Sequence, residues 1–203
     1  MRVLDAAASA ELMKGIAPLA MHTVVKTVDE VQTFAKKTGY PLVLKALSPK
    51  IIHKTEVGAV SIVHAADQLS KEFAALKKLA PTILAQEFVK GSEFILGLKK
   101  DPVFGHVILA GIGGIYVEVY KDVSFRVCPI AASEAEALLD DLQGKAILEG
   151  VRGKKLRKQA FIDAIVKLSH LPERQPKITE LDINPFILND QEGKIVDARV
   201  VLE

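Results

Sequence analysis

The sequence contains no tryptophan, and aromatic residues make up only 5% of the chain. Because 49% of the residues are hydrophobic, the predicted core must be built mainly from aliphatic side chains. Cys128 is the single cysteine, so no disulfide can form within the chain, as expected of a protein in a reducing cytoplasm. Cys128 lies in an alternating pattern without metal-ligating neighbours, and we interpret it as structural.

The sequence also lacks an excess of charge and a long apolar run. Its 27 basic and 25 acidic residues nearly balance, which gives no reason to expect nucleic acid as a partner. The N-terminal segment has no apolar stretch that predicts a signal peptide or a membrane anchor, so we expect a soluble, cytoplasmic protein. The 203 residues are enough for one large domain or two small lobes.

Short strands alternate with helices along the chain, which predicts an α/β (α+β) fold. A capping box at residues 27–30 begins one helix, and Gly39 ends it. We expect two lobes that meet near residues 85–90, with boundaries at 1–85 and 86–203. Apolar or alternating stretches predict strands over residues 22–26, 41–46, 57–63, 83–89, 94–99, 107–110, 115–120, 123–130, 178–183, 186–188 and 195–201.

Lys45 interrupts the apolar strand predicted over residues 41–46. A lysine inside such a strand must either be paired or reach a cleft. From this stretch alone, Lys45 could lie on an edge strand and point to water, or it could direct its charge at a phosphate. Both interpretations stay open at this point.

A polar loop, residues 48–58, follows this strand and contains His53, Glu56 and Gly58. Backbone amides beside small residues can bind phosphate oxygens. A neutral imidazole nitrogen can attack a γ-phosphate and carry the phosphoryl group covalently. Taken by itself, however, a loop histidine is more often only solvated.

Residues 86–93 follow another predicted strand. They could form an ordinary strand and turn, or a hinge whose backbone binds adenine while Glu93 accepts hydrogen bonds from ribose hydroxyls. The glycines at 111, 113 and 114 resemble a nucleotide loop only superficially. Since a predicted strand rather than a helix follows them, we exclude a dinucleotide-binding fingerprint.

Two further groups of polar residues lie on predicted strands. Alternation places Arg126 on a face of small residues, where it could clamp a phosphate or lie at the surface. Glu180, Asp182 and Asn184 share one face of a later strand, and Asp197 comes from the next strand. Such oxygen ligands suit Mg²⁺ bridging ATP phosphates, although an exposed polar face is the alternative. Pro185, which would end the row, and Asp197 favour the metal site.

Several short sequence fragments occur together between about residues 39 and 201. In their residues and in their order along the chain, these fragments resemble those of the ATP-grasp subunit of NDP-forming acyl-CoA synthetases, such as the β subunit of ADP-forming acetate–CoA ligases. Ala59 stands where the family has a second glycine, and the stretch between residues 66 and 86 is shorter than usual. The fragments that carry the resemblance are residues 39–45, 48–58, 101–105, 113–126, 181–185 and 196–200.

The resemblance implies an ATP-grasp fold of two lobes with nucleotide bound between them. It implies an acid–CoA ligase (ADP-forming) that converts acyl-CoA, ADP and phosphate into organic acid, CoA and ATP. His53 would carry the phosphoryl group to and from a CoA-binding α subunit in a heterotetramer, and Asp182 would stabilise its charged form. The implied nucleotide-binding residues are Lys45, Glu56, Glu87, Val89, Glu93 and Arg126, and the implied Mg²⁺ ligands are Asn184 and Asp197.

Two alternatives remain from the sequence. One is an ATP-grasp ligase that forms an acyl-phosphate directly, against which His53 argues. The other is a non-catalytic, regulatory nucleotide-binding lobe. The retention of Lys45, His53, Asp182, Asn184 and Asp197 argues against that second possibility.

Overall fold

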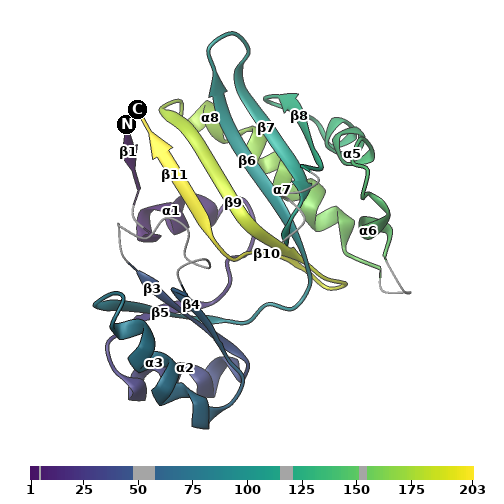
Figure 1. Cartoon of the computed structure of the whole chain (residues 1–203). Coiled ribbons are helices and arrows are strands. Elements are labelled where there is room, and N and C mark those ends of the chain that lie inside the picture. Colours follow the sequence, from purple (N-terminus) through teal and green to yellow (C-terminus); the bar gives the residue numbers. More distant parts are fainter. Residues whose placement is uncertain (5, 48–57, 115–120, 151–154) are drawn as a thin grey trace. The chain divides into compact units, whose positions relative to one another are not determined.

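The described part of the chain divides into two compact units (Figure 1). Unit 1 contains Met1–Leu19 and Lys90–Glu203, and unit 2 contains Ala20–Val89. This division differs from the expected lobes, because Met13 and Ile16 pack in the core of unit 1 with the C-terminal part. The computed structural model describes residues 1–4, 6–47, 58–114, 121–150 and 155–203.

Unit 2 is a four-stranded antiparallel sheet in the order β2-β5-β3-β4. The helices α2 and α3 pack against it, as Figure 1 shows. Aliphatic side chains from both helices and from β3 make the core of this unit. Its elements are β2 (His22–Val25), α2 (Val28–Thr38), β3 (Leu42–Leu47), β4 (Val60–Val63), the 3₁₀ turn η1 (Ala66–Gln68), α3 (Leu69–Lys77) and β5 (Thr82–Glu87).

The beginning and end of α2 follow the prediction from the sequence. The Thr27 hydroxyl accepts a hydrogen bond from the Glu30 amide at 3.3 Å. The Glu30 carboxylate accepts from the Lys26 amide at 2.6 Å, one residue before the residue that a standard capping box uses. Gly39, with a φ of 76°, donates its amide to the Ala35 carbonyl oxygen at 2.8 Å and ends the helix.

Unit 1 is built on a larger antiparallel sheet in the order β1-β11-β9-β6-β7-β8, and β10 pairs with β9. Helices α5 and α7 pack against this sheet. Its elements are β1 (Arg2–Val3), α1 (Ala6–Met13), β6 (Ser92–Asp101), β7 (Gly105–Ile112), β8 (Val123–Val127), α5 (Ala132–Asp140), α6 (Ala146–Glu149), α7 (Lys158–Ser169), α8 (Leu171–Arg174), β9 (Ile178–Leu188), β10 (Gly193–Ile195) and β11 (Ala198–Leu202).

Three phenylalanines form the centre of the core of unit 1. Phe161 of α7 lies between Phe94 of β6 and Phe186 of β9, with ring centroids 5.0 and 5.1 Å apart. All three side chains are fully buried. These three aromatic side chains lie where α7 meets the sheet, and aliphatic residues fill the rest of the core of unit 1.

Strand β9 corrects one prediction. The sequence predicts a break between residues 183 and 186, but the strand continues through Pro185 to Leu188. The predicted break falls at the point where the neighbour of β9 changes from β11 to β10. The register between β9 and β6 also shifts there. Proline is tolerated at such a point because a ladder bond from its missing amide is not needed.

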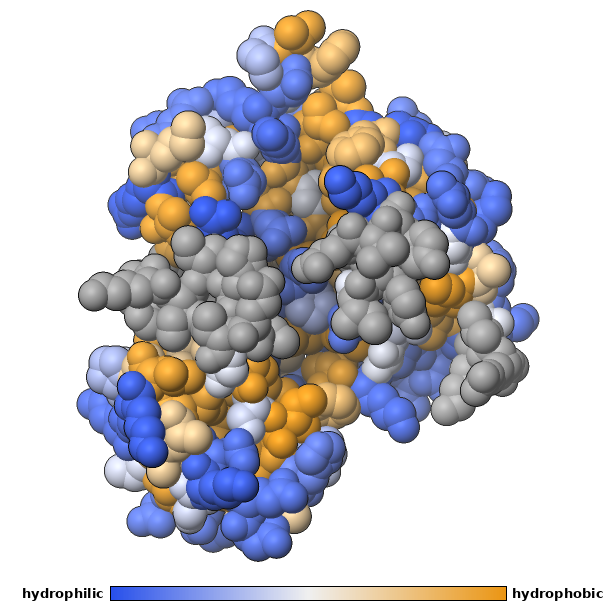
Figure 2. Space-filling view, viewed as in Figure 1, coloured by the Kyte–Doolittle hydropathy of each residue, from blue (hydrophilic) through white to orange (hydrophobic). Residues whose placement is uncertain are grey.

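Hydrophobic residues also reach the surface at the tip of the β6–β7 hairpin, at the top of Figure 2. Val103 and Phe104 are 80% and 65% exposed there. The tip therefore extends the surface of unit 1 and adds nothing to its core. Within the described residues, we find no helix with the length and apolar character that a membrane-spanning helix needs.

Candidate functional site

Polar side chains gather on the face of the unit 1 sheet that does not form its core. Leu181 and Ile183 of β9 are buried in that core. Because side chains alternate along a strand, Asp182 and Asn184 point to the other face, where both are exposed. The cross-strand neighbours of Asp182 are Gly97 of β6 and Arg199 of β11.

Asp197 lies beside this row, immediately before β11. The backbone amide of Asn184 donates to the Asp197 carbonyl oxygen at 3.2 Å, which places the two residues next to each other. The Asp197 carboxylate accepts from the Ala198 amide at 3.1 Å. The predicted pair of oxygen ligands is therefore brought together by the β9–β11 pairing.

The charge around Asp182 favours a cation. Loss of hydration on folding raises the pKa of Asp182 above its ordinary value, and the negative charges of Glu180 and Asp197 raise it further. Arg199 lowers it in part, and its guanidinium also pairs with Glu180 at 3.2 Å. A bound cation at this face would relieve the remaining repulsion between the carboxylates.

The donors present fit Mg²⁺. Among the described residues, no group of three or more His, Cys, Asp or Glu side chains could hold a metal by themselves. Magnesium bound with a nucleotide usually takes only one or two protein carboxylates, and phosphate oxygens and water complete its shell. Asn184 and Asp197 supply hard oxygen donors of this kind, and a Mg²⁺ ion held by them would take its remaining ligands from phosphate oxygens and water.

Glu93 belongs to the same unit and the same face of the sheet. It lies near the start of β6, opposite Ile187 of β9, and its side chain is exposed. The next residue, Phe94, points into the core. The Glu93 carbonyl oxygen accepts a hydrogen bond from the Gly113 amide at 2.7 Å, so its backbone is held while its carboxylate stays accessible.

Lys45 belongs to unit 2. Its strand, β3, is paired on both sides, opposite Val60 of β4 and Leu84 of β5. Lys45 is only 6% exposed, and it points away from the core side chains of Leu44 and Ala46. The interpretation as a water-facing lysine on an edge strand is therefore wrong.

Glu87 and Val89 lie where the chain passes from unit 2 to unit 1. Strand β5 ends at Glu87, whose carboxylate accepts from the Met21 amide at 2.8 Å. The Glu87 amide donates to the Met21 carbonyl oxygen at 2.9 Å. The side chain of Glu87 thus extends the pairing of β5 with the segment before β2.

Arg126 lies on the opposite face of its sheet from Asp182. The cross-strand neighbour of Arg126 on β7 is Ile108, which is buried in the core. Asp182 is aligned across the sheet with Gly97, Leu109 and Phe125, and Phe125 is the residue next to Arg126, so it takes the other face. The alternation predicted for β8 is confirmed, but the structure does not bring Arg126 to the face that carries the acidic residues.

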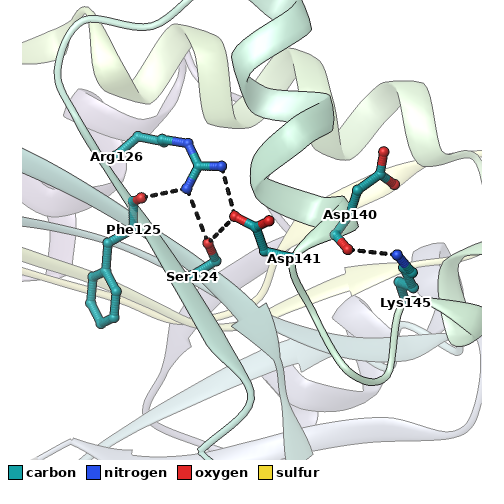
Figure 3. A network of polar contacts seen from close by, with 6 residues as sticks. All are labelled: Ser124, Phe125, Arg126, Asp140, Asp141 and Lys145. Carbon is teal, nitrogen blue, oxygen red and sulfur yellow. Dashed lines mark hydrogen bonds and ion pairs between the residues drawn. The ribbon is translucent and has the colours of Figure 1, made fainter.

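The partners of Arg126 explain its position (Figure 3). Its guanidinium pairs with the Asp141 carboxylate at 2.7 Å and donates to the Phe125 carbonyl oxygen at 2.8 Å. It also donates to the Ser124 hydroxyl at 3.3 Å, and that hydroxyl donates to Asp141 at 3.2 Å. This network ties β8 to the end of α5.

The sequence did not point to Asp122, which the structure places between the end of β7 and the loop after α5. Its carboxylate accepts hydrogen bonds from the amides of Gln143 at 2.9 Å and Gly144 at 2.7 Å. Because these partners lie more than twenty positions away, no local pattern reveals them. The remaining two predicted residues, His53 and Glu56, lie outside the described residues.

Comparison with known proteins extends these observations over the whole chain. Residues 1–202 match the family model of the ATP-grasp domain. The β subunit of ADP-forming acetate–CoA ligase I from Pyrococcus furiosus is 36% identical over 197 residues, which cover 91% of this chain and 85% of that subunit. ADP-forming acetate–CoA ligase I from Archaeoglobus fulgidus is 37% identical over 195 residues, 91% of this chain, but the chain spans only 28% of its length.

A solved structure is similar over the full length. The dinucleotide-forming acetyl-coenzyme A synthetase 1 of Ca. Korarchaeum cryptofilum, in complex with coenzyme A, Ca-AMPCP and HgCl+, has a TM-score of 0.90 and 32% identity. The similarity covers 100% of this chain and 94% of that one. The same protein with coenzyme A and Mg-AMPPCP, its phosphohistidine segment pointing towards the nucleotide binding site, has a TM-score of 0.84 and 32% identity, covering 98% of this chain and 92% of that one.

These similarities confirm the ATP-grasp fold of mixed α and β content expected from the sequence. The match reaches nearly every residue, and the chain covers most of a relative that is more than 30% identical. The chain therefore belongs to the ATP-grasp family, in the group that contains the β subunits of ADP-forming acetate–CoA ligases.

Proposed function

We propose that this chain is the nucleotide-binding subunit of an ADP-forming acyl-CoA synthetase, with acetate as the acid. The overall reaction converts acyl-CoA, ADP and phosphate into acid, CoA and ATP. The observation that carries the proposal is the coverage of 85% of a β subunit of ADP-forming acetate–CoA ligase at 36% identity. The group of oxygen donors on the unit 1 sheet supports it independently.

Each nucleotide-binding role is assigned to a residue of one unit. Lys45 neutralises phosphate charge, the main chain of residues 87–89 binds adenine, and Glu93 binds ribose. We leave Arg126 out of this set, because its guanidinium is held by Asp141 on the core side of the sheet. Glu56 keeps the phosphate-side role that the resemblance implies.

Asn184 and Asp197 hold Mg²⁺ together with the nucleotide phosphates. The metal supplies positive charge that stabilises the transferring phosphoryl group. A complex of the related synthetase with Mg-AMPPCP supports this choice of metal. In the chain itself, loss of hydration raises the pKa of Asp182 most, and the nearby negative charges of Glu180 and Asp197, which a cation would offset, raise it further.

His53 carries the phosphoryl group. In the direction of ATP synthesis, the bond between phosphorus and the His53 nitrogen breaks as a terminal β-phosphate oxygen of ADP bonds to that phosphorus, and the imidazole leaves neutral. Asp182 accepts a hydrogen bond from the other ring nitrogen and stabilises the charged, phosphorylated ring, as the acid of a catalytic triad orients its histidine. The phosphohistidine segment of the related synthetase supports this role.

A CoA-binding α subunit supplies the remainder of the reaction, in a heterotetramer. The β-subunit relative implies a separate partner subunit. In the longer relatives, of which the chain spans 28%, the corresponding segment is part of a larger polypeptide. We place the protein in the cytoplasm, where its single cysteine stays reduced.

The proposal is tested with γ-labelled ATP and Mg²⁺. We expect acid-labile, base-stable label on His53, located by mass spectrometry. His53→Ala should abolish the label and retain ADP binding, because the imidazole accepts the phosphoryl group without holding the nucleotide. His64→Ala, which changes an exposed histidine of the same unit, should remain fully labelled. Full labelling of His53→Ala, or label on another residue, would contradict the mechanism, and a wild-type chain that takes up no label would favour direct acyl-phosphate formation.

A further inference from the structure

Two glycines lie directly against Glu93. The Gly113 amide donates to the Glu93 carbonyl oxygen at 2.7 Å. A methyl group added to Gly113 would lie 2.7 Å from the Glu93 carbonyl carbon and 2.8 Å from the Phe94 nitrogen. Real Cβ atoms do not approach backbone so closely, so any side chain at position 113 would displace the backbone of Glu93.

Gly114 lies beside the carboxylate of Glu93. A methyl group added there would lie 3.3 Å from the Oε2 atom of Glu93. Gly114 also has a φ of 78°, a conformation that L-residues with side chains rarely adopt. Without side chains, the two glycines leave the room that the Glu93 backbone and carboxylate occupy, and a side chain at either position would displace them.

The glycine pair is itself fixed from the side opposite Glu93. The amide of Ile112 donates to the Asp122 carbonyl oxygen at 3.1 Å. The Asp122 carboxylate in turn accepts from the amides of Gln143 and Gly144. Residues 112–113 are thus bonded to the start of β6 and to Asp122, which is in turn bonded to the loop after α5.

We propose that Gly113 and Gly114 are positioning residues that hold the Glu93 carboxylate where it accepts hydrogen bonds from the ribose hydroxyls of ADP. This inference rests on the proposed function, which assigns ribose binding to Glu93. A carboxylate whose backbone is already held in place binds a hydroxyl pair at lower entropic cost, and a site built for hydroxyls rejects an analogue that lacks one. The glycine pair thereby determines the preference for ribonucleotides over deoxyribonucleotides.

The measurement is the ratio of the Kd for 2′-deoxy-ADP to the Kd for ADP, by calorimetry with Mg²⁺ and the full chain. Gly114→Ala should lower this ratio about tenfold, with the affinity for 2′-deoxy-ADP nearly unchanged. Gly105→Ala is the matched control: Gly105 has a φ of 77°, but an added methyl group there would meet nothing within 4 Å. It should be strained equally and keep the wild-type ratio.

Gly114→Asn serves as a second variant, because asparagine tolerates positive φ while still crowding Glu93. It should show the same reduced ratio with a smaller loss of Tm. An unchanged ratio in both Gly114 variants, or an equal loss in Gly105→Ala, would overturn the positioning role. If Glu93→Ala, which removes the acceptor oxygens, also keeps the wild-type ratio, then ribose binding by Glu93 is wrong, and that failure lies in the proposed function.

Discussion

At the residue scale, the partners of a charged side chain decide what it can do. Arg126 has the sequence context of a phosphate ligand, yet its guanidinium donates to Asp141, Ser124 and Phe125. The hydrogen bonds from Arg126 and then Ser124 hold the pKa of Asp141 below its ordinary value of 3.8. Asp141 therefore stabilises the fold at neutral pH and loses this contribution as the pH falls from 3.8 through the folded pKa.

We expect Asp141→Asn to lower the Tm by about 1–3 °C at pH 7, because an exposed ion pair contributes modestly. The difference from wild type should shrink below pH 4, where the carboxylate of the wild type also becomes neutral. Scanning calorimetry at both pH values measures it.

Asp140→Asn is the matched control on the same helix. Its carboxylate is 3.6 Å from Lys158, too far for a strong hydrogen bond, so the loss should be smaller. An effect of Asp141→Asn that does not depend on pH would show that the ion pair with Arg126 does not stabilise the protein.

At the scale of elements, local signals predicted α2 well. Thr27→Ala should lower the free energy of unfolding by about 1 kcal/mol, since the Glu30 amide loses its acceptor at the helix N-terminus. Urea denaturation measures this change. Thr33→Ala is a suitable control, because Thr33 lies inside the same helix and bonds only to the Asp29 carbonyl oxygen. Equal destabilisation by both variants would contradict the cap.

Strand β9 shows where local signals failed. Asn184-Pro185 resembles the end of a strand, but the segment continues because β10 pairs with it beyond that point. The exchange of β11 for β10 as the neighbouring strand depends on residues 193–202, which no local pattern connects to Pro185. The register with β6 shifts between the acidic row and Phe186, and the two lie on opposite faces of the sheet.

At the scale of the whole molecule, the chain should bind nucleotide but not complete the reaction alone. Mg-ADP at about 100 times its Kd should raise the Tm by about 5–10 °C, and EDTA should remove most of that shift. Purified alone, the chain should form no ATP from acetyl-CoA, ADP and phosphate, which a coupled ATP assay measures.

Asp197→Ala should lose most of the Mg-dependent shift, because it removes one of the proposed ligands. Asp190→Ala, an exposed aspartate of the same unit, should keep it. Sustained ATP formation by the single chain would contradict the need for a CoA-binding partner, and an unchanged shift in Asp197→Ala would remove that residue from the metal site.

The sequence by itself determined the class of fold, most strands, the cap of α2 and the family. These follow from alternation, from capping residues and from motifs a few residues long, all of which act locally. The order of motifs along the chain was enough to identify the residues of the nucleotide and metal sites as candidates.

Only the tertiary structure decided which candidates lie together. Strand pairing placed Asp197 beside Asn184, put Lys45 on a central strand, and turned Arg126 to the core side of its sheet. It also brought Gly113 onto Glu93 across twenty residues of sequence. The physical reason is that each of these relations depends on long-range register and on which face a side chain takes, and a one-residue change in register reverses that face.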